Sequence, residues 1–200
     1  MSSAAPTPGE EPILAELAEV GYETRSLADL RHSGERYRDA VPVLVGWLPR
    51  VSDRKVKEEI VRALSVPWAK PAATRPMIDE FRRVDASVDP TGTGLRWSIG
   101  NALDVLADDS VFDELVELVR DRRYGKARQM IVLGVGKSKR PEAVDVLLSL
   151  VDDPDVDGHA VKALGKLKAT SARPALERKL EDNRAWVRGE ARKALARLPQ

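Results

Sequence analysis

Residues Arg173 to Leu195 read RPALERKLEDNRAWVRGEARKAL and join two helical patterns across a short turn. Pro174 stands in the first turn of the first helix, where proline is tolerated because its missing N–H would have no intrahelical acceptor. The second helix carries four apolar residues at spacings of four, three and one: Val187, Ala191, Ala194 and Leu195. These spacings place all four on one face. The stretch therefore predicts an amphipathic helical hairpin.

The columns of the second helix recur five times along the chain, without gaps. The first apolar column holds Val56, Leu95, Ala127, Val156 and Val187, and the position directly after it holds Lys57, Arg96, Arg128, Asp157 and Arg188. A column of small residues, where adjacent helices would approach closely, holds Ala63, Ala102, Gly134, Ala163 and Ala194. A pattern that recurs every few tens of residues predicts hairpins that bury their apolar faces on one another.

This pattern, a helix with Pro and spaced leucines, then Asp, then Val-Arg, then Ala and Ala-Leu, resembles the HEAT repeat. It is most similar to the short bacterial type also found in phycobilisome lyases, and the resemblance covers about residues 35–200. It implies an all-α fold: an α-solenoid, or HEAT-like right-handed superhelix, of about five helical hairpins. Residues 11–34 are expected to form a degenerate N-terminal helix pair. The resemblance leaves the function open, because this fold hosts many roles.

Composition bounds the organisation of the chain. Residues 1–10 have too little apolar surface to offset the entropy of ordering them, so we expect a disordered tail at 1–10 and one HEAT-like repeat domain at 11–200. Two connections are irregular, the turn-rich insert at 85–94 and the Pro-rich segment at 67–76. The sequence has neither a signal-peptide pattern nor 18 consecutive apolar residues. We therefore expect a cytoplasmic protein with no membrane partner.

Sequence motifs give little support to catalysis. The chain has no cysteine, which excludes thiolate metal sites, and its two histidines, His32 and His159, are far apart and outside any His-Glu-x-x-His pattern. Gly136-Lys137-Ser138 is similar to the end of a phosphate-binding loop, but that motif needs a glycine where Ile131 stands. We therefore expect no enzyme activity, no catalytic residue, no metal and no cofactor. A lyase or DNA-glycosylase-like enzyme is an alternative by fold analogy only.

The basic column has a structural interpretation. In HEAT repeats such arginines typically bond to aspartates at the inter-helix turns of adjacent repeats. The resemblance thus implies a structural ladder in which four cations face four aspartates: Lys57, Arg96, Arg128 and Arg188 with Asp53, Asp121, Asp153 and Asp182. Asp157 takes the place of the cation in the fourth repeat, so the contact there should be missing or inverted.

Charge is unevenly divided between the two helices of the hairpins. The whole chain has 33 Lys and Arg against 32 Asp and Glu. The five expected second helices nevertheless hold 16 basic against 5 acidic residues, over 54–65, 95–107, 126–137, 157–168 and 184–197. The first helices hold 8 basic against 13 acidic residues. Because second helices line the concave side of HEAT-like solenoids, the resemblance implies a basic concave face.

Candidate partner-binding residues lie on these second helices, opposite or beside the apolar columns. They are Arg62, Trp97, Asn101, Met130, Leu133, Lys137, His159, Lys162, Lys166, Lys193 and Arg197. Apolar side chains among cations favour a non-enzymatic scaffold for a protein or peptide, with an acidic segment and an apolar anchor. Nonspecific binding of nucleic-acid phosphates by the same face is the alternative. We expect no small-molecule ligand. The four tryptophans are interpreted as packing residues.

Overall fold

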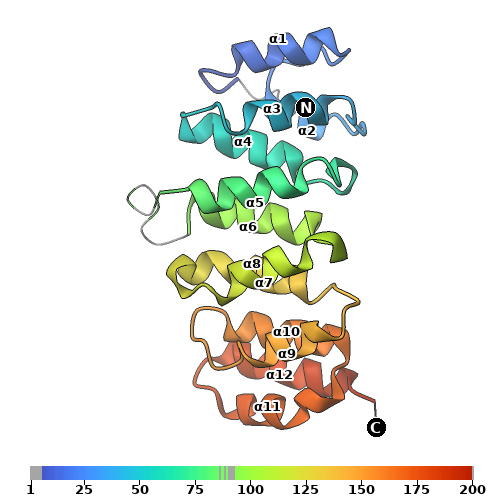
Figure 1. Ribbon diagram of the computed structural model, residues 1–200, viewed down its shortest axis with the longest axis vertical. Helices are drawn as coiled ribbons and strands as arrows, with labels where there is room; N and C mark the ends of the chain where they lie inside the picture. Colours follow the sequence, from blue (N-terminus) through green and yellow to red (C-terminus); the bar gives the residue numbers. More distant parts are fainter. Residues whose placement is uncertain (1–5, 86, 88, 90–92, 200) are drawn as a thin grey trace. The chain divides into compact units, whose positions relative to one another are not determined.

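The computed structural model describes residues 6–85, 87, 89 and 93–199, and every regular element among them is a helix (Figure 1). Twelve α-helices follow one another in this part of the chain, joined by turns and short 3₁₀ segments. Ten of them pair as the five predicted hairpins, and the first two precede these pairs. The all-α repeat architecture is thus confirmed, while the hand of the superhelix stays a prediction.

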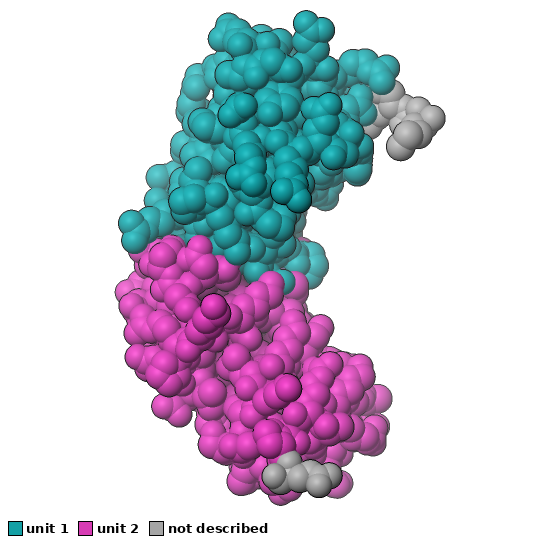
Figure 2. Space-filling view, turned by 90° about the vertical axis from the view of Figure 1, so that its right-hand side faces the viewer, with its two compact units in different colours: residues 1–90, 94–106 teal, residues 91–93, 107–200 magenta. Residues whose placement is uncertain are grey.

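The chain divides into two compact units (Figure 2). Unit 1 contains residues 1–90 and 94–106, and unit 2 contains residues 91–93 and 107–200. The sequence predicts a single repeat domain at 11–200; the two units carry two and three of its five hairpins, respectively. Each unit has a core of its own and is described by itself.

Unit 1 comprises the N-terminal helix pair and the first two hairpins. Its helices are α1 (Glu11–Glu19), α2 (Leu27–His32), α3 (Ala40–Trp47), α4 (Arg54–Leu64), α5 (Thr74–Arg83) and α6 (Leu95–Leu106). Helix α1 packs on α3 and α2 packs on α4, so the pair covers the first hairpin. Helix α4 also packs on α6, which joins the second helices of the two hairpins. Fully buried Leu17, Leu44 and Ile60 belong to this core.

Polar groups fix where the first helices of unit 1 begin. Ser26 caps α2 by accepting a hydrogen bond from the backbone N–H of Asp29, at 3.0 Å. Glu10, the last residue of the predicted tail, is buried, and its Oε2 accepts from the backbone N–H of Leu27 at 3.1 Å. This contact joins the start of α1 to the start of α2. Residues 1–5 of the predicted tail lie outside the described residues.

Unit 2 comprises the last three hairpins. Its helices are α7 (Phe112–Arg120), α8 (Gln129–Val135), α9 (Glu142–Leu148), α10 (Asp157–Leu167), α11 (Arg173–Arg178) and α12 (Ala185–Arg197). Helix α10 packs on both α8 and α12. The second helix of the third repeat was expected over 126–137 but begins only at Gln129, after a 3₁₀ segment at Arg122–Arg128. Gly125 adopts φ 48° within that segment, a conformation that an α-helix cannot accommodate.

Small residues allow the second helices of unit 2 to approach closely. A Cβ atom on Gly136 would lie 2.6 Å from the Cβ of Ala163, and one on Gly165 would lie 2.6 Å from the Cα of Ala194. Ala163 and Ala194 therefore stand at close approaches, as their column predicts. In each case the residue on the other helix is a glycine two positions after the column of small residues. The C-terminal end of each second helix therefore packs against the second helix of the next repeat.

Candidate functional site

A buried ion pair links the third and fourth repeats. Arg128 is fully buried, and its Nη1 donates to Asp153 Oδ2 and to the carbonyl of Val119, each at 2.9 Å. Asp153 lies in the loop before α10, so the contact has the form that the ladder predicts. Burial raises the pKa of Asp153, but the hydrogen bond from Arg128 and nearby positive charge outweigh this effect and hold the pKa below its usual range. The pair therefore fixes that loop against the third repeat.

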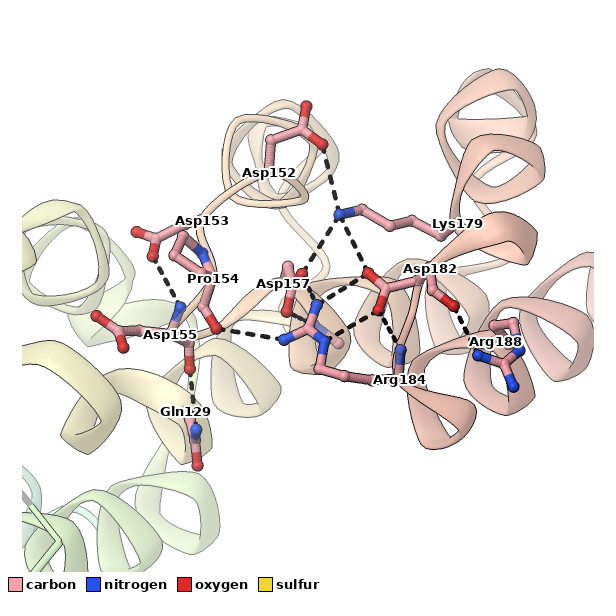
Figure 3. A network of polar contacts seen from close by, with 11 residues as sticks. Gln129, Asp152, Asp153, Pro154, Asp155, Asp157, Lys179, Asp182, Arg184 and Arg188 are labelled. Carbon is pink, nitrogen blue, oxygen red and sulfur yellow. Dashed lines mark hydrogen bonds and ion pairs between the residues drawn. The ribbon is translucent and has the colours of Figure 1, made fainter.

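The junction between the fourth and fifth repeats has the opposite polarity (Figure 3). Asp157 stands in the basic column and is buried, and its carboxylate accepts from Arg184 and, at 3.3 Å, from Lys179. Arg184 also pairs with Asp182 at 2.9 Å. The hydrogen bond from Arg184 lowers the pKa of Asp182 to about 2, against the raising effect of burial. The sequence predicts a missing or an inverted contact in the fourth repeat, and the structure shows an inverted one.

The other predicted ladder cations use different partners. Lys57 pairs with the buried carboxylate of Glu80, a residue of α5 rather than of a loop. Arg96 donates to the carbonyls of Phe81 and Val84, and Arg188 donates to those of Asp182 and Asn183. The predicted aspartate partners of these three cations are therefore wrong. The last carbonyls of a helix have no intrahelical donor, so a nearby guanidinium can donate to them in place of an aspartate.

Two predicted ladder aspartates serve local roles. Asp53 caps α4, because its Oδ1 accepts from the backbone N–H groups of Lys55 and Val56 at 2.8 and 3.0 Å. Asp121 pairs with Arg123 at 2.7 Å, two residues away. The hydrogen bonds from Arg123 lower the pKa of Asp121 despite the opposing effect of burial. Within the described residues, Arg128–Asp153 is thus the one predicted cation–aspartate pair that forms.

Most partner-binding candidates of unit 2 reach solvent from α8, α10, α12 or the turn after α8. Lys137, Lys166, Lys193 and Arg197 are exposed, and Met130, His159 and Lys162 are half-buried. Leu133 was expected on the open face but is buried, at 5% exposure. Helix α8 is only seven residues long and packs against α7, α9 and α10, so neighbouring helices cover this side chain. Leu133 belongs to the core of unit 2.

An aromatic pair lies at the N-terminal ends of α10 and α12. Trp186 is 47% exposed, the highest value among the large hydrophobic residues described. Its indole lies against Gly158, where any Cβ would overlap the ring, and its centroid is 5.5 Å from that of His159 in an edge-on contact. Gly158 therefore provides the space that Trp186 occupies. The sequence-based interpretation of Trp186 as a packing residue misses the exposed part of its indole. The sequence feature that could have placed the ring is Gly158, one repeat earlier, because a residue without a side chain leaves room for it.

His159 adds an apolar surface beside this indole. Its Nδ1 is buried and has no hydrogen-bond partner among the described residues. Burial, reinforced by the positive charge of Lys162, lowers the pKa of His159 below 6.5, while Asp157 and Glu190 act in the opposite direction. The imidazole is therefore neutral at pH 7. The pair presents aromatic surface at the N-terminal ends of α10 and α12, and Lys162, Lys166, Lys193 and Arg197 follow further along the same two helices.

The candidates of unit 1 make contacts within their own helices. Arg62 is exposed and pairs with Glu59 of α4 at 2.8 Å. Asn101 donates from Nδ2 to the carbonyl of Trp97 at 3.1 Å, and both side chains are half-buried on α6. A similar local pair joins Lys193 and Glu190 in unit 2, at 2.8 Å. Local acidic partners therefore reduce the net charge around Arg62 and Lys193.

Neither metal-binding clusters nor membrane-spanning helices occur in the described parts of the chain. There, no three His, Asp or Glu side chains gather so that they could hold a metal ion. None of the helices described is both long enough and apolar enough to cross a bilayer.

Comparisons with known proteins agree with this architecture. Two designed armadillo repeat proteins have similar structures: YIII(Dq)4CqI, with a TM-score of 0.55, and YIII(Dq.V1)4CPAF in complex with peptide (KR)4, with a TM-score of 0.58. Each is 16% identical to this chain over 96% of its length, and the matches cover 96% and 95% of the designed chains, respectively. No curated protein has a matching sequence. The family model of HEAT repeats matches residues 112–196. The chain is therefore a helical-repeat protein, and its residues 112–196 match the model of HEAT repeats.

Proposed function

We propose that this chain is a non-enzymatic scaffold that binds a protein or peptide on the solvent-facing side of α10 and α12. The surface consists of two aromatic and four basic side chains, called here the α10–α12 face: His159, Trp186, Lys162, Lys166, Lys193 and Arg197. The observation that carries the proposal is the half-exposed indole of Trp186, held against Gly158 and His159.

The indole has the properties of an interface anchor. A tryptophan that keeps 47% of its surface in water leaves a large apolar area unburied in the free protein. Covering such area on binding contributes about 25 cal/mol per Å² of apolar surface, and tryptophan is enriched among the residues that dominate interfaces. Because Gly158 and His159 already fix the ring, little conformational entropy remains to be lost on binding.

The cations further along α10 and α12 favour an acidic partner. Lys162, Lys166 and Arg197 lie on the same two helices as His159 and Trp186. Opposite charge steers association and disfavours partners of like charge. The designed armadillo repeat protein with a similar fold is in complex with the basic peptide (KR)4. The basic side chains of the α10–α12 face are complementary to a peptide of the opposite charge, an acidic one.

Defined peptides test this function. Fluorescein-labelled (Asp-Glu)₄ with a central Leu-Phe should bind the full chain, whereas (KR)₄ should not. Replacing Lys162, Lys166 and Lys193 together by Glu should weaken binding, and so should Trp186→Ser. The charge control reverses Arg120, Lys139 and Arg173, which are exposed outside this face. Leu133 is kept, because its burial would confuse lost binding with lost stability.

Salt separates this function from the alternative of nucleic-acid binding. Affinity for duplex DNA falls with a logarithmic slope of about 0.9 per phosphate contact, and backbone binding is insensitive to an apolar anchor. If duplex DNA binds more tightly than the peptide at physiological salt, and Trp186→Ser leaves that affinity unchanged, the scaffold function is wrong. Equal peptide binding by parent and both face variants would also contradict it.

A further inference from the structure

Helices α10 and α12 lie side by side and point in the same direction. Near their N-terminal ends, Gly158 of α10 lies against the indole of Trp186 on α12. Toward their C-terminal ends, a Cβ on Gly165 would lie 2.6 Å from the backbone of Ala194. The contacts keep the same order at both ends, so the two helix axes are parallel. The α10–α12 face therefore has an N-terminal end and a C-terminal end that both helices share.

The solvent-facing residues form one row along each helix. The row on α10 contains His159, Lys162 and Lys166, and the row on α12 contains Trp186, Glu190, Lys193 and Arg197. Residues three and four positions apart lie on the same side of a helix. With a rise of about 1.5 Å per residue, Lys193 and Arg197 lie about 10 and 16 Å along the axis from Trp186. The face thus begins with aromatic rings and continues with cations.

The N-terminal end of the face is charge-balanced. Arg184 pairs with both Asp157 and Asp182. Lys179 pairs with the same two carboxylates, at 3.3 and 3.9 Å. Glu190 follows one turn after the indole on α12. A carboxylate of a partner would therefore meet no excess of positive charge beside the aromatic rings.

The C-terminal end of the face has an excess of positive charge. Lys166 and Arg197 are exposed there, and neither makes an ion pair within the described residues. Residues 160–176 and 191–199 contain four and three Lys or Arg, respectively, and no Asp or Glu. The last carbonyls of a helix carry about half a negative charge, so those of α10 and α12 together offset about one of the two unpaired cations. The remaining charge attracts anions to this end.

We infer that the partner binds along α10 and α12 in a fixed register, an inference that rests on the proposed function: an apolar side chain covers Trp186, and acidic side chains lie about 10–16 Å away, at Lys166 and Arg197. An extended segment rises about 3.3 Å per residue, so about three to five positions separate the two contacts. A helical ligand would need about seven to eleven residues for the same span, a length that is marginal for an isolated helix. The recognised motif is an extended segment with an apolar residue, a short spacer and an acidic cluster.

Isomeric peptides test this register. The spaced peptides are Phe-Gly-Ser-Glu-Glu-Glu and its reverse, Glu-Glu-Glu-Ser-Gly-Phe, and the compact isomer is Gly-Ser-Glu-Phe-Glu-Glu. All three are acetylated and amidated, so they have the same composition and charge. Each is titrated into the ¹⁵N-labelled full chain at physiological salt, and NMR chemical shifts give the affinity. The tighter of the two spaced peptides should bind at least about fivefold more tightly than the compact isomer, whose carboxylates cannot reach the C-terminal end while its Phe covers the indole.

Variants at the two ends of the face locate the contacts. Arg197→Glu should weaken the spaced peptide at least about fivefold and remove most of its advantage over the compact isomer, because it places a like charge against the acidic cluster. Arg192→Glu is a matched reversal at an exposed position of α12 outside the row, and it should change the affinity less than about twofold. Trp186→Ser should weaken all three peptides, because it removes the apolar anchor.

The outcomes separate this register from the proposed function. Equal affinities for the spaced and compact isomers, or equal losses in Arg192→Glu and Arg197→Glu, would overturn the register. If all peptides still lose affinity in Trp186→Ser, the proposed function stands without it. Absence of saturable shifts with every peptide up to millimolar concentration would overturn both. Arg192 and Arg197 are exposed, so the urea midpoints of their variants should equal that of the parent, and a loss of affinity then reports on binding.

Discussion

Asp157 accepts a hydrogen bond from Arg184, and so reverses the polarity of the contact that joins the preceding pair of repeats. At that earlier junction the cation, Arg128, lies directly before the second helix, at the end of the 3₁₀ segment, and the carboxylate, Asp153, lies in the loop of the following repeat. Both junctions pair a cation with a carboxylate across the boundary between two repeats. The cation comes from the earlier repeat at one junction and from the later repeat at the next, so either repeat can supply either charge.

Loss of the buried carboxylate at the inverted junction should be costly. Asp157→Ala leaves Lys179, whose side chain is 13% exposed, without its buried partner. Breaking a buried pair of this kind costs about 3–5 kcal/mol, and the partial exposure of Arg184 reduces this to about 2–3 kcal/mol. Urea unfolding measures the change. Asp152→Ala, at a side chain that is 73% exposed, is the control and should cost less than about 1 kcal/mol.

The close approach of α10 and α12 predicts opposite effects of the same substitution at two glycines. Gly165→Ala should destabilise unit 2 by about 1–3 kcal/mol, because the new Cβ would lie 2.6 Å from the backbone of Ala194. Gly189→Ala meets nothing within 4 Å and should stabilise α12 by about 0.5–1 kcal/mol through helix propensity. Thermal unfolding of the two variants checks both signs. If Gly165→Ala were as stable as the parent, the packing of these helices would differ from that described.

The carboxylate of Asp182 should make the free energy of unfolding depend on pH in the acid range. Its pKa falls from 3.8 to about 2 in the folded chain, so the folded state binds fewer protons than the unfolded state between these values. The stabilising contribution is complete above about pH 4 and is lost as the pH falls toward 2. Urea unfolding of the parent and of Asp182→Asn at pH 2–5 measures it. Between pH 5 and pH 2 the free energy of unfolding should fall less in Asp182→Asn than in the parent. Equal slopes against pH would contradict the lowered pKa of Asp182.

The imidazole of His159 should titrate below the usual histidine range. Its burial lowers the pKa, and the charge of Lys162 lowers it further. An NMR titration of the ring protons should therefore give a midpoint below 6.5. Lys162→Met should raise that midpoint, because it removes a neighbouring positive charge, whereas Lys166→Met serves as the control. Stability due to this histidine is present at neutral pH and declines as the pH falls below 6.5, since the unfolded state then binds more protons.

The fold followed from the sequence because helical periodicity is a local property. Val187, Ala191 and Ala194 are fully or almost fully buried, as their spacing predicts. The N-terminal helix pair was also placed correctly at 11–34, and Asp157 was correctly identified as the irregular member of the basic column. The boundaries were less accurate. Gly125 delays the start of α8 by three residues, and a positive φ at one glycine leaves no periodic signal.

The candidate site was predicted less well, because its side chains depend on neighbours that are distant in sequence. Leu133 lies opposite the apolar columns on a helical projection, yet three helices cover it. Trp186 precedes a fully buried valine and gives no local sign of its exposure. Only the absence of a side chain at Gly158, 28 residues earlier, explains where the indole lies.

By itself, the sequence determined which segments are helices, that they recur as hairpins and where small residues allow close packing. These properties depend on residues within one or two turns of each other, so they can be seen along the chain. The tertiary structure alone decided which partner each buried charge takes, as with Lys57 and Glu80, and which surface stays open, as with the indole of Trp186. A buried ion accepts any nearby group that offsets its desolvation, and the nearest such group is fixed only when the helices pack.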